Sequence, residues 1–341
     1  MSPSRRKLRV LVLIAPGLTP PDDIAQRSDQ ERHAFKTEYD VLTTLRALGH
    51  DARPLEVQDE LAPIRREVDE WKPHVVFNLL EAFFDLREFD QHVVSYLELL
   101  RVPYTGCNPR GLVLARDKAL AKKILTYHRI PVPKFDVVHE GRRVRRPKAL
   151  RFPLIVKSLT EEASTGIAQA SVVWNDDELE ARVRFIHEGI TGDALVEEFI
   201  EGREIYVGVL GNKRVTVLPP WELFFEHTSP GSVPIATERA KHNLDYQSRH
   251  GITEGPANME PALRDRLVAT ARRIYRALSL DGCARLDFRL RADGTAFFIE
   301  ANPNPEIASK EEFAQSALHA GMRYDKLIDT IVSLGIRRGA V

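Results

Sequence analysis

Cysteine is scarce in this chain of 341 residues, which contains only Cys107 and Cys283. A secreted scaffold of this size usually carries more cysteines, and two residues so far apart cannot form a CxxC metal or redox pair, so we expect a cytoplasmic protein. A net charge is also missing, because 49 basic residues balance 49 acidic ones. Without a global positive field, the chain is not expected to bind nucleic acid or an anionic membrane surface.

Long apolar runs are absent too. Residues 8–14 form an apolar run after several basic residues, as in a signal peptide, but the run is short and ends in Ala15-Pro16-Gly17 without a small-residue cleavage site. We interpret it as a buried first strand. No segment approaches the ~20 apolar residues of a membrane-spanning helix, so no membrane association is expected. The chain is 43% hydrophobic and 29% charged, which is typical of a folded globular protein with about two domains.

The first third of the chain alternates strand and helix patterns, which predicts a small α/β layer with a mainly parallel sheet. The predicted strands cover residues 8–14, 51–57 and 75–77, and the predicted helices cover residues 31–48, 61–71 and 89–100. In such sheets, ligands bind beyond the carboxyl ends of the strands. The loop that begins at Asn78 and contains Glu81 is therefore a candidate for substrate contact. A helix-rich segment, 111–128, follows.

Beyond residue 152 the pattern changes to antiparallel strands with one intervening helix. The strands are predicted over residues 153–157, 168–173, 194–200 and 204–210. Asn175 and Glu178 are placed as the N-cap and third residue of the helix. The basic run 142–151 could bind phosphate, but we favour a solvated turn or linker. Residues 221–258 are rich in Gly, Pro and His, and a loop of that length is often a lid.

A hairpin over residues 283–302 is the strongest local signal. Asp293-Gly294 between two alternating runs predicts a two-residue turn. Asp287 then lies opposite Glu300 and Arg285 opposite Asn302, all on one face of the hairpin. The other face is predicted to be apolar and to contain Leu286, Phe288, Leu290, Phe297, Ile299 and Ala301.

The opposed acids of this hairpin predict a metal site. Two carboxylates ~5 Å apart repel by about 3 kcal/mol at an effective dielectric constant of ~20. A divalent cation would offset that repulsion, and the oxygens of Asp287, Glu300 and Asn302 suit Mg²⁺, whose coordination phosphates and water complete. The alternative is that Arg285 and Arg289 neutralise the pair on an exposed face. We favour the metal, because only a site explains why Asn302 is in line with the acids.

A Mg²⁺ site of this kind implies a phosphate-bearing ligand. Lys157 ends an apolar strand, and the loop after it closes with Ser164, Thr165 and Gly166, where backbone N–H groups could approach phosphate oxygens. Alone, Lys157 would be interpreted as a surface lysine, and Lys118 at a helix start is equally ambiguous. An acidic strand end could offer adenine a backbone hinge and ribose a carboxylate, or be solvated surface. Its residues are Glu197, Glu198, Ile200 and Glu204.

Taken in order, these motifs resemble the ATP-grasp superfamily, and the D-alanine:D-alanine ligases in particular. The segments that carry the resemblance are Asp117-Lys118, Lys157 with its loop, Glu197-Glu198-Phe199-Ile200 with Glu204, Lys241, Arg285-x-Asp287 and Glu300-Ala301-Asn302. The resemblance covers nearly the whole chain and implies an α/β fold of three lobes, with ATP clamped between the last two. The implied lobes are an N-terminal α/β substrate lobe, 1–110, a central lobe, 111–200, and a C-terminal lobe, 201–341, with a lid loop, 221–258, and the Mg-binding hairpin, 283–302.

The same resemblance implies roles for the site residues. Lys118 and Lys157 would contact the ATP phosphates, and Lys241 would reach the γ-phosphate. Glu197 and Ile200 would hold adenine, and Glu204 would bind ribose. Arg285 would stabilise the tetrahedral intermediate, and Mg²⁺ would be held by Asp287, Glu300 and Asn302. The cofactors would be ATP and two Mg²⁺ ions, and the protein would form a homodimer.

The implied reaction is ATP-dependent amide formation on an amino acid or short peptide. A substrate carboxylate accepts the γ-phosphoryl group, and an amine then displaces phosphate. Two other classes stay open: an ATP-grasp phosphotransferase, and a nucleotide-binding protein that has lost catalysis. The complete set of charged residues disfavours the second of these.

The substrate half departs from the pattern of those ligases. Residues 15–20 replace their glycine-rich and serine-containing first loop, Ala163 stands in place of a substrate-contacting serine, and residues 303–306 follow the last motif in place of their own continuation. D-alanyl-D-alanine is therefore not the expected product. Glu81 could receive a substrate ammonium and Lys310 a carboxylate, while each is equally plausible as a surface or helix-start residue.

Overall fold

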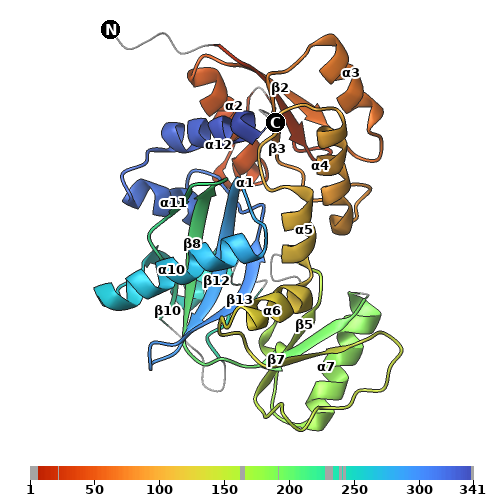
Figure 1. Ribbon diagram of the computed structural model, residues 1–341, viewed down its shortest axis with the longest axis vertical. Coiled ribbons are helices and arrows are strands. Elements are labelled where there is room, and N and C mark those ends of the chain that lie inside the picture. The colour runs from red at the N-terminus through yellow and green to blue at the C-terminus, as the bar shows by residue number, and fades with distance from the viewer. Residues whose placement is uncertain are drawn as a thin grey trace.

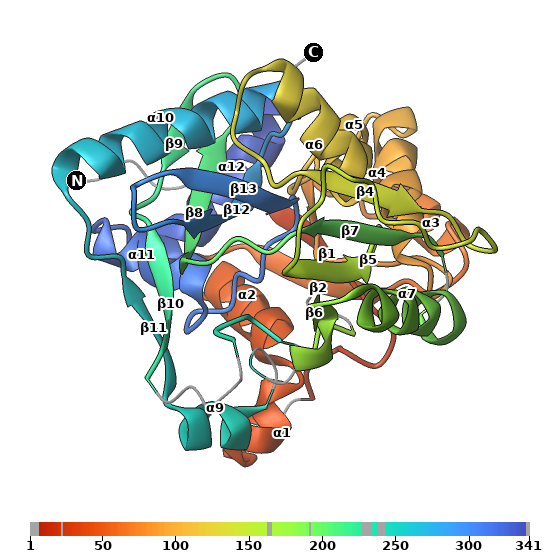
Figure 2. The same ribbon diagram turned by 90° about the horizontal axis from the view of Figure 1, so that it is seen from below.

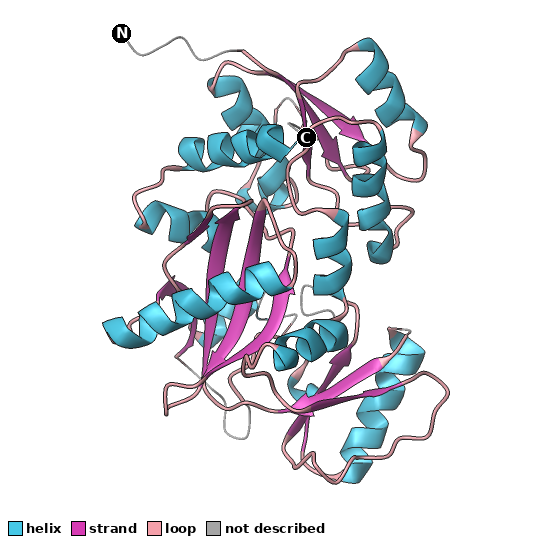
Figure 3. Cartoon of the chain, in the orientation of Figure 1, coloured by secondary structure: helices cyan, strands magenta, loops and turns pink. Residues whose placement is uncertain are grey.

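The computed structural model describes residues 7–21, 23–161, 166–190, 192–226, 233–237, 240 and 243–338. Three β-sheets follow one another along the chain, and helices cover them (Figure 1). Figure 3 shows how the strands gather into these separate sheets. In the part of the chain that the structure describes, every helix is too short or too polar to cross a membrane.

The first sheet is parallel, with the strand order β2-β1-β3. Its strands are β1 (Arg9–Ile14), β2 (Asp51–Glu56) and β3 (Val75–Asn78). The central strand β1 is buried on both faces, because Val10 and Val12 pack in one core cluster and Leu11 and Leu13 in the other. Burial on both faces explains the unbroken apolar run and confirms the predicted buried strand.

Helices cover both faces of this first sheet. They are α1 (Asp29–His33), α2 (Lys36–Ala47), α3 (Ala62–Glu70) and α4 (Asp90–Leu99), with the 3-10 turns η1 (Ile24–Gln26) and η2 (Arg87–Phe89). The single helix predicted over 31–48 is wrong, since the chain breaks between α1 and α2. The predicted helix-rich segment 111–128 is likewise two helices, α5 (Pro109–Arg116) and α6 (Lys118–Tyr127). Asp117 is extended between them and caps α6 through the N–H of Leu120, which leaves Lys118 at the first position of that helix.

The second sheet is antiparallel, with the strand order β4-β7-β5-β6. Its strands are β4 (Phe135–Val138), β5 (Leu154–Ser158), β6 (Val172–Val173) and β7 (Ala194–Glu198), and helix α7 (Asp176–Gly189) packs on one face. Half of the strand predicted over 168–173 is instead the 3-10 turn η3 (Gln169–Ser171), and only β6 is a strand. Asn175 caps α7 as predicted. The basic run 142–151 connects β4 to β5, and its Arg146 pairs with Asp176 at the surface.

The third sheet is antiparallel and has the strand order β11-β10-β8-β12-β13, with β9 beside β8. Its strands are β8 (Arg203–Gly211), β9 (Val215–Val217), β10 (Trp221–Phe225), β11 (Ile252–Pro256), β12 (Cys283–Leu290) and β13 (Ala296–Asn302). Helix α10 (Pro261–Ala277) covers one face through Leu267, Ile274 and Tyr275. The other face carries the charged residues of the site.

The prediction that 221–258 is a loop throughout is wrong. Strands β10 and β11 form its ends and pair with each other, and α9 (Leu244–His250) lies between them. The alternating Trp221–Phe225 run explains the first strand, because it adds an edge to β8. The last two helices are α11 (Glu312–His319) and α12 (Tyr324–Arg338), and α12 packs with α2 on the first sheet. The division of the chain after residues 110 and 200 stays a prediction.

The hairpin of β12 and β13 pairs Asp287 with Glu300 and Arg285 with Asn302, as predicted, but its turn differs. The loop has three residues, with Gly294 at a positive φ of 81° and its N–H donating to the carbonyl of Arg291. That longer turn shifts the register by one residue. A bulge at Ile299, which has no partner on β12, shifts it back.

Because of the bulge, the apolar face of the hairpin also differs from the predicted one. Phe298, in place of Phe297 and Ile299, packs in the core and meets Phe288 edge to face at 6.2 Å between ring centroids. Ile299 is instead half-buried and lines the cavity described next.

Candidate active site

A cavity lies where the second and third sheets meet, which Figure 2 shows side by side. Strands β5 and β7 form one wall, and β8, β12 and β13 form the other. The predicted site residues that line this cavity are Lys157, Glu197, Glu198, Ile200, Glu204, Asp287 and Glu300. The structure therefore brings together residues from two sheets that are more than 100 positions apart in the sequence.

A buried charge cluster forms one wall of this cavity. Glu197 of β7 contacts the ammonium of Lys157 on the neighbouring strand β5 at 2.5 Å. Lys122 of α6 lies 3.2 Å from the other carboxylate oxygen of Glu197 and donates to the carbonyl of Ile299. All three side chains are at most 5% exposed. One carboxylate thus serves two ammonium groups.

The cluster shifts the protonation equilibria of its members in different directions. Burial lowers the pKa of Lys122 to about 8, despite the attraction of Glu197. Burial would also lower the pKa of Lys157, but the charges of Glu197 and Glu300 outweigh it and raise that pKa. For Glu197, burial opposes ionisation, while Lys122 and Lys157 outweigh it and lower the pKa. At neutral pH the cluster therefore carries a net positive charge next to the cavity.

Lys122 is the member of this cluster that sequence reasoning missed. Its signal was present, because Lys118 and Lys122 are four residues apart on a helix and so share a face. Lys118 donates to the carbonyl of Glu161 and lies 3.8 Å from the carboxylate of Glu300. Lys118, Lys122 and Lys157 thus converge from α6 and β5 on the end of the hairpin.

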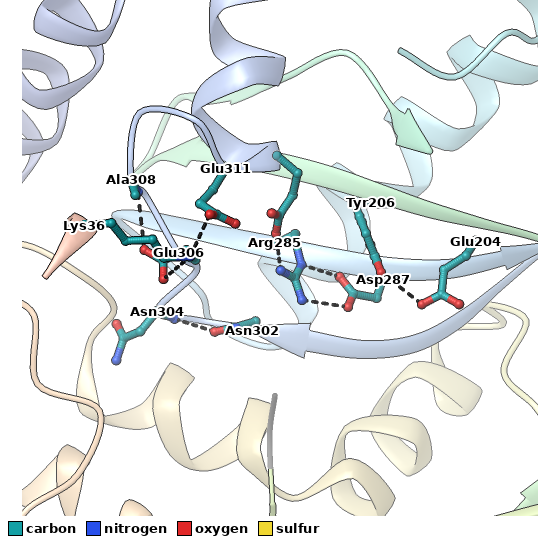
Figure 4. Close-up of polar contacts among 11 residues, drawn as sticks. Lys36, Glu204, Tyr206, Arg285, Asp287, Asn302, Asn304, Glu306, Ala308 and Glu311 are labelled. Atoms are coloured by element: carbon teal, nitrogen blue, oxygen red, sulfur yellow. Dashed lines mark hydrogen bonds and ion pairs between the residues drawn. The ribbon is translucent and has the colours of Figure 1, made fainter. Parts of the chain in front are cut away.

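Arg285 organises the charged face of β12. Its Nε and Nη2 donate to the two oxygens of Asp287 at 2.8 and 3.0 Å (Figure 4). Its Nη1 donates to Glu312 of α11. The guanidinium carbon also lies 4.8 Å from the ring centroid of Tyr206. Burial would lower the pKa of Arg285, but Asp287 and Glu312 outweigh it and hold the pKa well above its ordinary value. Arg285 is therefore a fixed cation at this position.

The face that carries Arg285 and Asp287 is buried, with both residues less than 10% exposed. The alternative placed the two acids on an exposed face, and that exposure is wrong. Its other part is correct for one residue, because Arg285 does neutralise Asp287. Arg289 turns instead to Glu204, at 3.4 Å, and to the carbonyls of Gly202 and Pro234. Tyr206 donates to Glu204 as well. Glu204 is thus held at the cavity edge by two neighbours.

Two of the predicted metal residues, Asp287 and Glu300, line the cavity between the sheets, and the third, Asn302, lines an adjoining cavity. Asp287 and Glu300 are directly paired across β12 and β13, and Asn302 follows two residues further on, where its Oδ1 accepts the N–H of Asn304. Within the described ranges, no three His, Cys, Asp or Glu side chains cluster closely enough to hold a metal ion. The predicted set contains two carboxylates and one amide, so it has only two members of those types.

Other predicted residues lie around this centre or outside the description. Gly166 has a positive φ, and its carbonyl accepts from Arg182, so it packs against α7 while the next residue, Ile167, lines the cavity. The predicted phosphate-loop residues Ser164 and Thr165 and the predicted lid residue Lys241 lie outside the described residues.

Two further cavities adjoin the charged face of the hairpin. One, lined by Arg285 and Asn302, shares five lining residues, Glu81 among them, with a cavity of about 370 Å³ beside the first sheet. Glu81 is exposed at this shared rim. Lys310 is exposed and lines neither cavity, so the structure does not bring it to this space.

Comparison with known proteins shows the family of this chain. The family model described as the D-ala D-ala ligase C-terminus matches residues 124–333, more than half of the chain. A D-alanine–D-alanine ligase of Desulforudis audaxviator is 31% identical over 305 residues, which cover 87% of this chain and 92% of that ligase. The chain belongs to the D-alanine–D-alanine ligase family.

Two further proteins, one known by sequence and one by structure, are similar to this member of the D-alanine–D-alanine ligase family. The "Uncharacterized protein y4sG" of Sinorhizobium fredii is 35% identical over 269 residues, which cover 77% of this chain and 75% of that protein. The D-alanine–D-alanine ligase of Bacillus anthracis, solved with ATP, superposes with a TM-score of 0.74 at 22% identity and covers 97% of this chain and 98% of that chain. The fold is therefore the ATP-grasp fold. Membership of the family makes the protein an ATP-grasp ligase, an enzyme that forms a C–N bond between small molecules.

Proposed function

We propose that this ligase joins a carboxylate to an amine through an acyl phosphate, using ATP. The observation that carries the proposal is that Lys157, Asp287 and Glu300 line one cavity, with Lys118 3.8 Å from Glu300 and Arg285 on the adjoining strand face. Phosphoryl transfer depends mainly on positioning and charge neutralisation, and this arrangement supplies both. The substrates are amino acids or short peptides, and the D-alanine half of the family pattern is altered.

The nucleotide occupies the cavity between the two sheets. Lys118 and Lys157 bind its phosphates. Lys122 keeps Glu197, the carboxylate partner of Lys157, in place. Ile200, buried on the cavity wall, contacts the adenine, and the hinge around Glu198 offers it backbone groups. Glu204, oriented by Arg289 and Tyr206, accepts the ribose hydroxyls. Lys241, Ser164 and Thr165, which lie outside the described residues, would complete the phosphate site.

Asp287, Glu300 and Asn302 fit Mg²⁺ by the chemistry of their donors. All three offer hard oxygens from one face of the hairpin, and phosphate oxygens would supply the ligands that the protein does not. When bound, one or two Mg²⁺ ions would neutralise charge on the phosphates. Arg285 must then share Asp287 with the metal, and its second partner, Glu312, keeps the guanidinium in position.

Arg285 binds the oxyanion that develops when an amine attacks the acyl phosphate. Its guanidinium is buried, fixed by two carboxylates and a ring face, and lines the cavity that leads away from the nucleotide. A donor that is fixed before the reaction stabilises developing charge without reorganising. Segment 221–258 contains the described strands β10 and β11, and its central part would close over the site and exclude water, which otherwise hydrolyses an acyl phosphate.

The experiment that tests this function measures ADP release by the full chain with Mg²⁺-ATP. D- and L-amino acids are supplied singly and in pairs, and each mixture is examined by mass spectrometry. A condensed product that requires the amine supports the ligase. Glu300→Gln should abolish ADP release while the protein keeps its melting temperature.

A phosphorylated product that needs no amine would replace this proposal with phosphotransfer. Wild-type turnover by the Glu300→Gln variant would contradict the proposed role of the hairpin in binding Mg²⁺. The expected homodimer is a separate proposal, which light scattering of the same sample tests.

A further inference from the structure

The cavity of about 370 Å³ beside the first sheet is large enough for a small-molecule site. It lies at the carboxyl ends of the parallel strands β1 and β3, which is where ligands bind in open α/β sheets. Ala15 and Asn78 mark those two strand ends on its wall. Because it shares lining residues with the cavity of Arg285 and Asn302, it is continuous with the reacting centre.

A buried carboxylate on this wall contacts no partner of opposite charge among the residues that the structure describes. Glu38 of α2 is 7% exposed and lines the cavity. Within the described part of the chain, its only hydrogen bond is to its own backbone N–H, and the charges that act on it are those of Glu306 and Lys36. Burial raises its pKa to about 7, because an ionised carboxylate is costly away from water.

The nearby lysine, Lys36, forms ion pairs with two other acids. The ammonium of Lys36 contacts Glu311 at 2.6 Å and Glu306 at 3.5 Å, and Thr37 also donates to Glu306 (Figure 4 shows the lysine with both acids). Lys36 therefore does not form an ion pair with Glu38, and it acts on it only at longer range. The cavity retains a carboxylate that a ligand cation can neutralise.

The remaining walls suit an aliphatic chain. Leu18, Phe77, Leu79, Ile307 and Ile331 line the cavity with Glu38. A substrate that only presents an α-amino acid with a methyl side chain would leave most of this apolar surface uncovered. A carbon chain that ends in a cation matches both the apolar wall and the buried acid.

We propose that Glu38 binds a cationic group at the end of a substrate side chain, so that this ligase uses an amino acid with a basic side chain. The inference rests on the proposed ligase function for the α-carboxylate or α-amine chemistry at Arg285. Glu38 acts as a specificity-determining residue: its carboxylate pairs with the substrate cation, while the aliphatic wall covers the chain between that cation and the reacting group.

The test compares ornithine with norleucine, whose side chains have the same number of heavy atoms and differ in an ammonium against a methyl group. Both enantiomers of each are supplied with Mg²⁺-ATP, and kcat/KM is measured from ADP release. Three proteins are used: wild type, Glu38→Gln, and Glu70→Gln as a matched control, because Glu70 is an exposed acid at the end of α3.

The wild type should prefer ornithine by about 30-fold or more, the lower range for losing one partner of a buried charge pair. Glu38→Gln should lose that preference and Glu70→Gln should keep it. Equal use of norleucine by the wild type, or an unchanged preference in Glu38→Gln, would overturn the inference and leave the ligase proposal standing.

A binding readout separates this inference from the ligase proposal. With Mg²⁺-ADP present, ornithine should raise the melting temperature of the wild type more than norleucine does, and this difference should vanish in Glu38→Gln. If no amino acid elicits ADP release but this difference is found, the cation site stands and the proposed function fails. If ornithine and norleucine shift all three proteins alike, the cation site is refuted.

Discussion

The carboxylate of Glu197 contacts the ammonium of Lys157 at 2.5 Å in the interior, on adjacent strands of the second sheet. Lys122 approaches the same carboxylate from α6 and reaches the bulged Ile299 on the third sheet. Lys122 therefore connects the second and third sheets at the proposed nucleotide cavity. It also couples Lys157, the lysine proposed to bind phosphate, to the strand that carries Glu300.

Removal of Glu197 should destabilise the protein more than removal of Lys122. Glu197→Gln removes the carboxylate that contacts both buried ammonium groups, so we expect the free energy of unfolding to fall by about 3–5 kcal/mol. Lys122→Met leaves one carboxylate with one ammonium and should cost less. Urea denaturation of both variants measures the difference, and a Glu197→Gln midpoint equal to that of wild type would contradict the buried cluster.

The same substitution at two arginines of β12 should have different kinetic effects. Lysine cannot span two partners as the planar guanidinium does. Arg285→Lys should lower kcat on the order of 10²-fold, with little change in KM for ATP, because Arg285 does not line the nucleotide cavity.

Arg289→Lys is the matched control, because Arg289 lines that cavity and orients Glu204. It should mainly raise KM for ATP. Steady-state kinetics at varied ATP gives both constants. If the two variants share one pattern, the separation of the reacting face from the nucleotide cavity is wrong.

The stability of the protein should depend on the ionisation of Glu38. Burial raises its folded-state pKa from 4.5 to about 7, so between these values the folded chain binds more protons than the unfolded chain. Stability is then lost as the pH rises through this window. Glu38→Gln cannot ionise and should be more stable than wild type at pH 8 in the absence of ligand, by at most about 3 kcal/mol.

The difference between these two proteins should disappear near pH 4, where Glu38 is protonated in both states. Thermal denaturation from pH 4 to pH 8 measures it. A constant difference across this range would show that the carboxyl group of Glu38 titrates as it would in water.

Two glycines should differ in their tolerance of alanine. A Cβ at Gly202, which precedes β8, would lie 2.3 Å from the carbonyl oxygen of Leu290, and φ there is +152°. Gly321 has a positive φ of 81° but nothing within 4 Å of its Cβ position. Gly321→Ala should cost about 1–2 kcal/mol for its backbone conformation alone.

Gly202→Ala should cost more than Gly321→Ala, because the clash involves backbone that also positions Glu204 and Arg289. Melting temperatures rank the two variants. A Gly202→Ala protein that melts no lower than Gly321→Ala would mean that this close approach is not maintained in solution.

Local patterns were enough to identify many elements of this protein. The apolar run of β1, the Asn175 cap, the position of Lys118 at a helix start and the opposed Asp287 and Glu300 all depend on neighbours in sequence or on one hairpin. The pairing of Asp287 with Glu300 was predicted from a two-residue turn, and it is found because a longer turn and the bulge at Ile299 cancel. The correct pair was thus reached through a register that only the folded hairpin shows.

The order of its motifs was enough to show the family resemblance. The sequence by itself also determined the parallel strands of the first sheet and the charged face of the hairpin, because propensity, alternation and capping act over a few residues. Only the tertiary structure decided that Glu197 lies between two lysines, that Glu312 shares Arg285, and that Glu38 is buried beside a cavity. Those relationships depend on the packing of distant elements. Burial and the distances between charges, which set the pKa values and the chemistry, arise only when those elements meet.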